Sequence, residues 1–178
     1  MVFEEKTISS EMIYEGSILN LRKDKVHVKD NRISYREIIE HNGGVAIAAI
    51  TAAGKMVLVR QYRKAAEKAV LEVPAGKIEA NEDHKLAAER ELKEETGYTA
   101  GKVKFITSFY SSVGYSTEVI YLYFATELTP GETNFDDNEA IDIQEYDLQD
   151  LKKMVLSGEI EDAKTIAAIL LAVSIMEK

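Results

Sequence analysis

Hydrophobic residues are spaced along most of this chain with the short periods of strands and helices. Residues 45–51 form an almost continuous apolar run, which is typical of a strand buried on both faces. Turn-forming residues separate this run from further short apolar segments, and two later segments repeat their apolar residues with a helical period. We therefore expect strands at 56–62, 69–73, 103–110, 119–126 and 141–146, and amphipathic helices at 148–156 and 163–176 with Asp147 and Asp162 as N-caps.

The first 41 residues also have strand patterns, but they are more polar than the rest of the chain. Short alternations occupy 18–21 and 26–28, residues 29–31 are typical of a polar turn, and 32–41 follow as another strand. A small antiparallel sheet needs a surface to pack on. We expect this segment to lie against the main domain or against a second subunit.

A third helix is expected between Asn81 and Gly97. Asn81 is placed to cap its N-terminus, Glu82 and Asp83 would fill a first turn where negative charge is favoured, and Gly97 would end it in the left-handed conformation. Strands then alternate with three helices, which indicates an α/β fold with a mixed sheet between helices.

Three carboxylates gather at the C-terminal end of this helix. With about 100° between successive residues, Glu91 and Glu95 point almost the same way, and Glu94 lies beside them. The helix dipole is negative at this end, so each carboxylate costs roughly 0.3–1 kcal/mol there. Arg90 offsets part of the repulsion through an i,i+4 contact with Glu94. A solvated acidic face is the ordinary interpretation of such a charge run, but a hard divalent cation, Mg²⁺ or Mn²⁺, would relieve the crowding.

Residues 76–98 resemble the signature of the Nudix hydrolases, G-x5-E-x7-R-E-U-x-E-E-x-G-U, in which U is a bulky aliphatic residue. Only Tyr98 departs from it, at the final packing position. The matching residues are Gly76, Glu82, Arg90, Glu91, Leu92, Glu94, Glu95 and Gly97. So many specified positions make the motif far more specific than a lone glycine-rich loop. The resemblance implies that Arg90 braces the carboxylates. Glu82 either serves the metal through water or is simply a charge at the helix N-terminus.

The likeness extends beyond the signature, from about residue 12 to near the end of the chain. The stretches REIIEH, VLVRQYR, LEVPAGKIE and SGEIEDAKT are similar to those of the ADP-ribose pyrophosphatase branch of the family. This resemblance implies the Nudix α/β/α sandwich with a mixed sheet, formed by residues 42–178. It also implies that an N-terminal antiparallel β segment, residues 1–41, is exchanged between the subunits of a homodimer.

The reaction that the resemblance implies is metal-dependent hydrolysis of a nucleoside diphosphate linked to a sugar, with ADP-ribose giving AMP and ribose 5-phosphate. One departure bears on the substrate, because Val113 stands where this branch usually has a proline. A proline would stiffen the loop. Its absence leaves another nucleoside diphosphate sugar or a dinucleotide as alternative substrates. A non-catalytic nucleotide-sensing domain is a further alternative, although such domains usually lose part of the motif that is complete here.

The resemblance also implies the metal ligands and the general base. The ligands of Mg²⁺ or Mn²⁺ would be the helix carboxylates, the backbone carbonyl before the signature glycine and a glutamate of the acidic loop 133–140, namely Ala75, Glu91, Glu94, Glu95 and Glu139. The base is expected from the same loop, with Glu139 first and Asp137 as its competitor. The helix glutamates, such as Glu94, are the remaining catalytic candidates.

Substrate contacts are expected from both parts of the chain. The resemblance implies that Arg63 contacts the diphosphate or the terminal phosphate of the substrate, and a planar guanidinium suits phosphate oxygens. Glu72 is expected to line the site near the metals, and Gly114 belongs to the loop around Val113. Arg36 and Glu37 occupy the place from which a partner subunit touches the adenine, with an exposed ion pair on a strand as the alternative.

The overall composition narrows the range of partners. The 178 residues include 22 basic and 31 acidic ones, and the net charge of −9 argues against non-specific binding to nucleic acid or to anionic membranes. The longest apolar run, 166–176, is about half the length of a membrane span. The chain has no cysteine, which fits a cytoplasmic protein. We expect a small nucleoside diphosphate and a second copy of the chain as partners.

Overall fold

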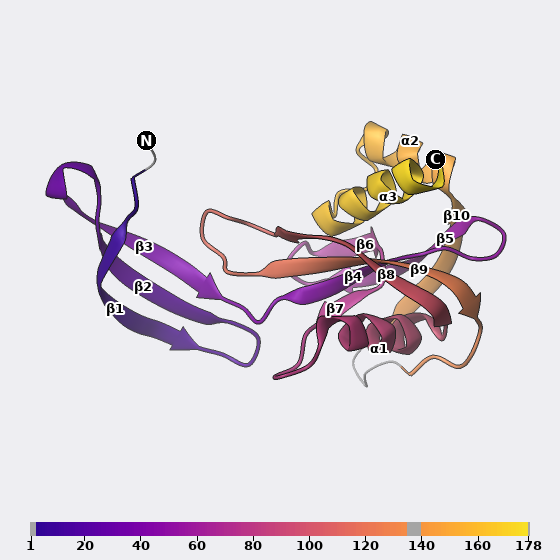
Figure 1. Cartoon of the computed structure of the whole chain (residues 1–178), viewed down its shortest axis with the longest axis horizontal. Helices are drawn as coiled ribbons and strands as arrows, with labels where there is room; N and C mark the ends of the chain where they lie inside the picture. The colour runs from indigo at the N-terminus through magenta and orange to yellow at the C-terminus, as the bar shows by residue number, and fades with distance from the viewer. Residues whose placement is uncertain (1–2, 135–139, 178) are drawn as a thin grey trace. The chain divides into compact units, whose positions relative to one another are not determined.

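The computed structural model describes residues 3–134 and 140–177. The chain divides into two compact units, Met1–Gly43 with Tyr110–Val119, and Gly44–Phe109 with Ile120–Lys178. Each unit has β-structure of its own (Figure 1). In the described part of the chain, no helix combines the length and the apolar character that a membrane crossing requires.

The N-terminal unit contains an antiparallel sheet of three strands in the order β1-β2-β3. Strand β1 covers Lys6–Glu15, β2 covers Asn20–His27 and β3 covers Ile33–Glu40. The predicted polar turn forms between β2 and β3, where Asp30 and Asn31 have φ angles of 62° and 55°. Short polar side chains tolerate this left-handed conformation.

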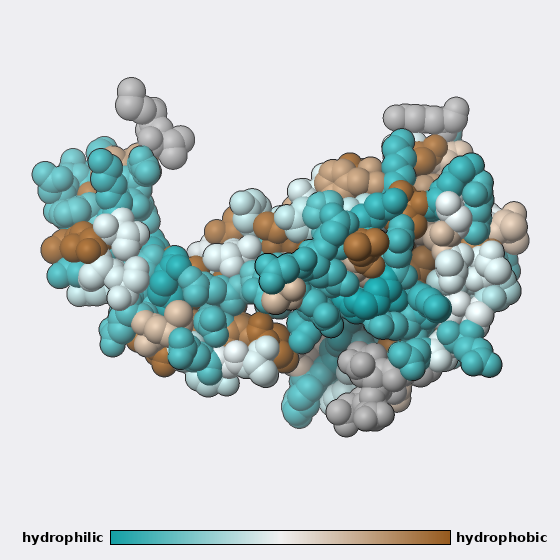
Figure 2. Space-filling model, turned by 60° about the horizontal axis from the view of Figure 1, so that its bottom comes forward, coloured by the Kyte–Doolittle hydropathy of each residue, from teal (hydrophilic) through white to brown (hydrophobic). Residues whose placement is uncertain are grey.

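This three-stranded sheet has almost no core of its own. Every residue of β1 is exposed, and within the three strands only Asp24 and Val26 are buried. Figure 2 shows apolar patches among the polar residues of this unit. Within residues 3–43, the large apolar side chains that are at least 43% exposed are Phe3, Ile8, Met12, Ile13, Tyr14, Ile18, Ile33 and Tyr35.

The main unit is built around β4, Gly44–Ala49, in which every residue is buried. Strand β4 pairs in parallel with β9, Val119–Thr129, and antiparallel with β7, Ala75–Lys77. Strand β8, Thr99–Tyr110, lies beyond β9 at the edge of this four-stranded sheet. The sheet is therefore mixed, as predicted, although the short strand β7 was not expected.

The remaining strands form a second sheet in the order β10-β5-β6. Strand β10 covers Ile141–Asp147, β5 covers Lys55–Arg63 and β6 covers Lys68–Glu72. All pairs in this sheet are antiparallel. The strands that the sequence predicted are present, but they are divided between two sheets.

Three helices complete the main unit: α1 at His84–Thr96, α2 at Leu148–Ser157 and α3 at Ala163–Met176. The predicted caps of the last two helices are confirmed. The Asp147 side chain accepts a hydrogen bond from the first turn of α2, and the Asp162 side chain does the same for α3.

The predicted start of α1 was wrong by two residues. Asp83, not Asn81, is the N-cap, and its carboxylate accepts the amide N–H groups of Lys85 and Leu86. Asn81 has a φ angle of 64° and lies in the turn before the helix. The predicted C-terminal end is confirmed, because Gly97 caps the helix with a φ angle of 73°.

Alternate residues of β4 pack against different helices. Val45 and Ile47 belong to a buried cluster with residues of α1, whereas Ala46 and Ala48 belong to a cluster with residues of α2 and α3. Helix α1 accordingly covers one face of the sheet, and α2 and α3 cover the other (Figure 1). The expected burial of this strand on both faces, and the sandwich of helices around the sheet, are confirmed.

Candidate active site and metal centre

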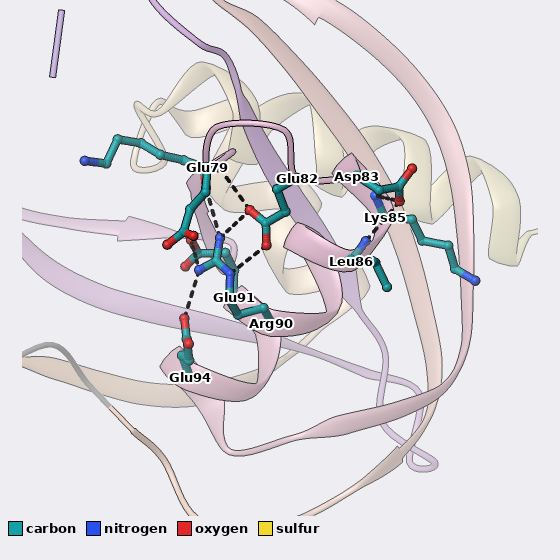
Figure 3. A network of polar contacts seen from close by, with 9 residues as sticks. Glu79, Glu82, Asp83, Lys85, Leu86, Arg90, Glu91 and Glu94 are labelled. Atoms are coloured by element: carbon teal, nitrogen blue, oxygen red, sulfur yellow. Dashed lines mark hydrogen bonds and ion pairs between the residues drawn. The ribbon is translucent and has the colours of Figure 1, made fainter.

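Arg90 of α1 is the centre of a polar network (Figure 3). Its Nε donates to Glu82 at 2.9 Å, and its Nη1 donates to Glu91 at 2.8 Å and to Glu94 at 3.0 Å. Its Nη2 donates to the other oxygen of Glu82 at 2.9 Å and to the carbonyl of Lys77 at 3.1 Å. The predicted i,i+4 contact is confirmed, and Arg90 braces three carboxylates of the motif as expected.

These contacts keep the network charged. The hydrogen bond to Glu82 raises the pKa of Arg90, and the bonds to Glu91 and Glu94 raise it further against the opposing effect of partial burial. In return, the hydrogen bond from Arg90 lowers the pKa of Glu82. One guanidinium faces three carboxylates, so an excess of negative charge remains around Arg90. A divalent cation would neutralise it.

Glu95 is the most buried carboxylate of the motif. The residue is 4% exposed, and its Oε2 accepts the amide N–H of Ala75 at 2.9 Å. Ala75 is the first residue of β7. The sheet therefore places the predicted backbone ligand beside one of the predicted carboxylate ligands.

Gly76 leaves the space that the Glu91 carboxylate occupies. A Cβ atom built on Gly76 would lie 2.0 Å from the carboxyl carbon and from Oε1 of Glu91. Gly76 is opposite Val45 in the antiparallel pairing of β7 with β4, which holds its backbone in place. The signature glycine is therefore needed here for the close approach of a carboxylate rather than for a special φ angle.

The acidic loop begins beside the C-terminal end of α1. The amide of Asn134 donates to the carbonyl of Glu94 at 3.0 Å. Gly131 also passes the helix cap closely, since a Cβ on Gly97 would lie 2.5 Å from the Gly131 carbonyl oxygen. The two candidate bases, Asp137 and Glu139, lie outside the described residues.

Arg63 and Glu72 form a two-pronged ion pair in the main unit. Nε and Nη2 of Arg63 donate to the two carboxylate oxygens at 2.7 and 2.9 Å. Lys164 of α3 donates to the same carboxylate. The sequence reasoning missed Lys164, and its only signal was a place in the SGEIEDAKT stretch that carried the resemblance.

The other predicted substrate residues belong to the N-terminal unit. Arg36 donates through Nε to Glu5 at 2.8 Å, and this bond raises the pKa of Arg36. Arg36 therefore makes an exposed ion pair, with Glu5 as its partner, while Glu37 is exposed on β3. A Cβ on Gly114 would meet no atom within 4 Å, and Val113 is 82% exposed. The substrate contacts of these residues stay predictions.

The donor set at the end of α1 suits a hard divalent cation, because carboxylate and carbonyl oxygens are the ligands that Mg²⁺ and Mn²⁺ prefer. The excess negative charge around Arg90 also fits such an ion. Within residues 3–134 and 140–177, no three His, Cys, Asp or Glu side chains are gathered so that they could hold a metal. Arg90 binds oxygens of Glu91 and Glu94 in this arrangement. The metal-ligand set stays a prediction.

A family model described as the NUDIX domain matches residues 40–169, and one described as the nucleoside diphosphate sugar hydrolase N-terminal domain matches residues 5–39. The chain belongs to the Nudix family. An ADP-ribose pyrophosphatase of Bacillus subtilis (strain 168) is 43% identical over 168 residues, which cover 93% of this chain and 91% of that protein. A methanol dehydrogenase activator of Bacillus methanolicus is 41% identical over 170 residues, with 94% and 92% covered.

A solved structure supports the Nudix fold independently. The crystal structure of an ADP compounds hydrolase matches with a TM-score of 0.88, covering 99% of this chain and 96% of that one. The two sequences are only 19% identical, so this likeness concerns the fold alone. The predicted Nudix sandwich is confirmed.

The Nudix signature glycine allows a test of the metal centre. In Gly76→Ala the new Cβ displaces the end of the flexible Glu91 side chain rather than any backbone atom. We expect the thermal unfolding midpoint to change little, while the affinity for Mn²⁺ falls by about tenfold or more. Circular dichroism melts and calorimetric Mn²⁺ titration measure the two effects.

Gly114→Ala is the matched control, because its Cβ meets nothing within 4 Å and should change neither quantity. A folded Gly76→Ala protein that binds Mn²⁺ as tightly as the wild type would show that Glu91 does not hold the ion.

Proposed function

We propose that the chain is a metal-dependent hydrolase that cleaves the diphosphate of a nucleoside diphosphate linked to a sugar, with ADP-ribose as the preferred substrate and AMP and ribose 5-phosphate as the products. The observation that carries this proposal is the arrangement of the Nudix carboxylates. Arg90 binds Glu82, Glu91 and Glu94, the Glu91 carboxylate lies against the Gly76 backbone, and Glu95 accepts the Ala75 amide. The 43% identity with the Bacillus subtilis ADP-ribose pyrophosphatase, over most of both chains, supports the choice of substrate.

Hydrolysis of a diphosphate requires water to attack one phosphorus in line, the bridging oxygen to leave with the other phosphate, and a base to take a proton from the water. When bound, Mg²⁺ or Mn²⁺ would neutralise the phosphoryl oxygens and acidify the water. The residues that would hold it are Ala75, through its carbonyl, and Glu91, Glu94, Glu95 and Glu139. Arg90 keeps the carboxylates that it contacts oriented. Glu139, with Asp137 as its competitor, would accept the proton.

Arg63 is the cation of the main unit that we assign to the diphosphate. Its side chain is 41% exposed, while Glu72 fixes its other edge. A net charge of −9 repels an anionic substrate from the chain as a whole. Attraction must therefore be local, from the metal and from Arg63.

A substrate panel tests the proposal. ADP-ribose, other nucleoside diphosphate sugars and dinucleotides are each incubated with Mg²⁺ or Mn²⁺, and the products are identified by mass spectrometry. The panel is broad because Val113 replaces the proline that the resemblance leads us to expect. We expect ADP-ribose to be cleaved fastest, and only with a divalent cation. A wild-type protein that binds these nucleotides but cleaves none of them would support the alternative of a sensing domain.

Glu95→Gln is expected to lower turnover by about 100-fold or more while the protein stays folded, because it removes a charged ligand without changing the shape. Glu89→Gln is the control on the same helix, since Glu89 pairs only loosely with Lys85 at 3.6 Å. Turnover near that of the wild type in Glu95→Gln would contradict the metal assignment.

Replacement of the general base should lower kcat with little change in KM, because the base acts mainly in the transition state. We expect this result for Glu139→Gln, or failing that for Asp137→Asn, in steady-state assays with the best substrate of the panel. If both variants keep kcat within about threefold, a change worth less than about 1 kcal/mol, the base lies among the helix glutamates such as Glu94.

We also propose that residues 1–41 are a dimerisation segment, that residues 42–178 form the hydrolase domain, and that a second copy of this chain covers the N-terminal sheet. The exposed apolar residues of that sheet and its near absence of a core support this, because a three-stranded sheet needs a surface to pack on. We propose the cytoplasm as the location, with no partner among nucleic acids or membranes.

A mixing experiment tests whether the partner completes each active site. Glu94→Gln and Arg36→Ala subunits should each be nearly inactive as homodimers. In a heterodimer, one site carries both changes and the other carries neither, so activity should recover to about half of the wild-type value per dimer. A monomer in sedimentation, or verified heterodimers without recovery, would contradict the shared site.

A further inference from the structure

Glu72 is a buried carboxylate that two cations share. It ends β6, and its side chain is 3% exposed. Arg63 binds both of its oxygens, from Nε at 2.7 Å and from Nη2 at 2.9 Å. Lys164 donates to Oε2 of the same carboxylate. A buried carboxylate with three such donors is held in one position and in its charged form.

Lys164 is in turn held by the start of α3. Its Nζ lies 3.1 Å from Oδ1 of Asp162, the N-cap of that helix. The other oxygen of Asp162 accepts the amide and the hydroxyl of Thr165 at 2.9 and 2.6 Å. The Thr165 hydroxyl accepts the amide N–H of Val73, the residue after Glu72, at 2.9 Å. Helix α3 and the end of β6 are thus connected twice.

The charges of this cluster extend to the predicted metal centre. Burial raises the pKa of Glu72, but the hydrogen bond from Arg63 and the charge of Lys164 outweigh it and hold this pKa below its usual value. The bond to Glu72 raises the pKa of Arg63, and the negative charges of Glu95 and Asp162 add to that effect. Arg63 therefore lies within electrostatic reach of Glu95.

We propose that Lys164 is a positioning residue for Arg63. Because Lys164 shares the Glu72 carboxylate, the Arg63 guanidinium stays fixed in place and keeps enough positive charge to attract the diphosphate of the substrate. The inference rests on the proposed function, because it takes Arg63 as the group that binds the diphosphate. Arg63 uses Nε and Nη2 on Glu72, and within the described residues its Nη1 makes no hydrogen bond. That nitrogen is left for a phosphate oxygen.

The count of charges explains why Lys164 matters. Arg63 and Glu72 alone would form a neutral pair with little attraction left for an anion. With Lys164, two cations face one carboxylate. Asp162 formally balances the added charge, but its second oxygen is bound by the N-terminus of α3, where the positive end of the dipole offsets part of the Asp162 charge. The Lys164 side chain is 17% exposed, and among the described residues its ion pairs are with these two carboxylates, so we expect its effect on an anion to pass through Glu72.

Steady-state kinetics of Lys164→Met test this role. We expect KM for the best substrate of the panel to rise about tenfold while kcat stays within about twofold, because Arg63 would bind the diphosphate less well in the ground state and the transition state alike. Lys164→Arg keeps the charge and should restore most of the wild-type KM. Should Lys164→Met fail to fold by circular dichroism, Lys164→Gln replaces it in the same assay.

Lys68→Met is the matched control. Lys68 connects the same two regions, through an ion pair with Glu161, but it does not touch Glu72. It should leave KM unchanged. A similar rise of KM in Lys68→Met would mean that Lys164 merely anchors α3, and it would overturn the proposal.

The path through Glu72 is tested by repeating Lys164→Met in a Glu72→Gln background. If Lys164 acts through this carboxylate, the substitution should change KM there by less than about twofold. An equal tenfold rise in both backgrounds would overturn the proposal and indicate that Lys164 contacts the substrate directly. An unchanged KM for Lys164→Met in the wild-type background would overturn it too.

Calorimetric titration with ADP in the presence of Mg²⁺ separates this inference from the proposed function. ADP presents a diphosphate whether or not the protein hydrolyses the compounds of the panel. We expect Lys164→Met to weaken ADP binding about tenfold and Lys164→Arg to restore it. If the wild type cleaves nothing in the panel but shows this pattern, only the proposed function fails. If ADP does not bind, or binds all variants equally, the role of Lys164 fails.

Discussion

The guanidinium of Arg90 connects the parts of the chain that meet at the end of α1. It reaches Glu91 and Glu94 on the helix itself, Glu82 before the helix, and the carbonyl of Lys77 at the end of β7. Without this cation, carboxylates at the negative end of a helix dipole would repel one another and move apart. Five donors in one rigid plane suit this task, and the single point charge of a lysine would not. The rest of the candidate site depends on that arrangement.

Strand β4 brings the two halves of the site together. Its antiparallel pairing with β7 sets Ala75 and Gly76 in place, while Val45 and Ile47 on one of its faces pack with α1. The same strand thereby determines how close the helix comes to the β7 backbone. The approach of Glu91 to Gly76, and the bond from the Ala75 amide to Glu95, follow from this packing.

An acidic chain that handles an anion needs local positive charge, and the main unit holds the Arg63 guanidinium within electrostatic reach of Glu95. Glu72 is buried without loss of its charge because Arg63 and Lys164 both bind it. Buried charges of this kind persist only when they are paired and hydrogen-bonded. These ion pairs also connect β6 to α3, so the position of the Glu72 carboxylate depends on how α3 packs.

The local patterns of the sequence predicted much of this fold and of the candidate site. The spacing from Gly76 to Gly97 identified the helix and its carboxylates, the apolar run at 45–51 predicted a doubly buried strand, and Asp162 was recognised as a cap. The start of α1 was misplaced because Asn81 and Asp83 are both good capping residues, and propensity alone does not choose between them. In the structure, Glu82 lies between these two capping residues and before the first turn of α1, and its carboxylate accepts a hydrogen bond from Arg90.

By itself, the sequence determined the features that depend on residues a few positions apart: helix faces, caps, turns and the order of the carboxylates. The tertiary structure decided which distant residues meet. Strand β7 has three residues, too few for a periodic signal. The partners of Glu72 are Arg63 of the adjacent strand β5, nine residues away, and Lys164 of α3, 92 residues away. Such contacts depend on strand register and on helix packing. Hydrophobic spacing in the sequence indicates which face of a strand or helix is buried, but not which residue packs against it.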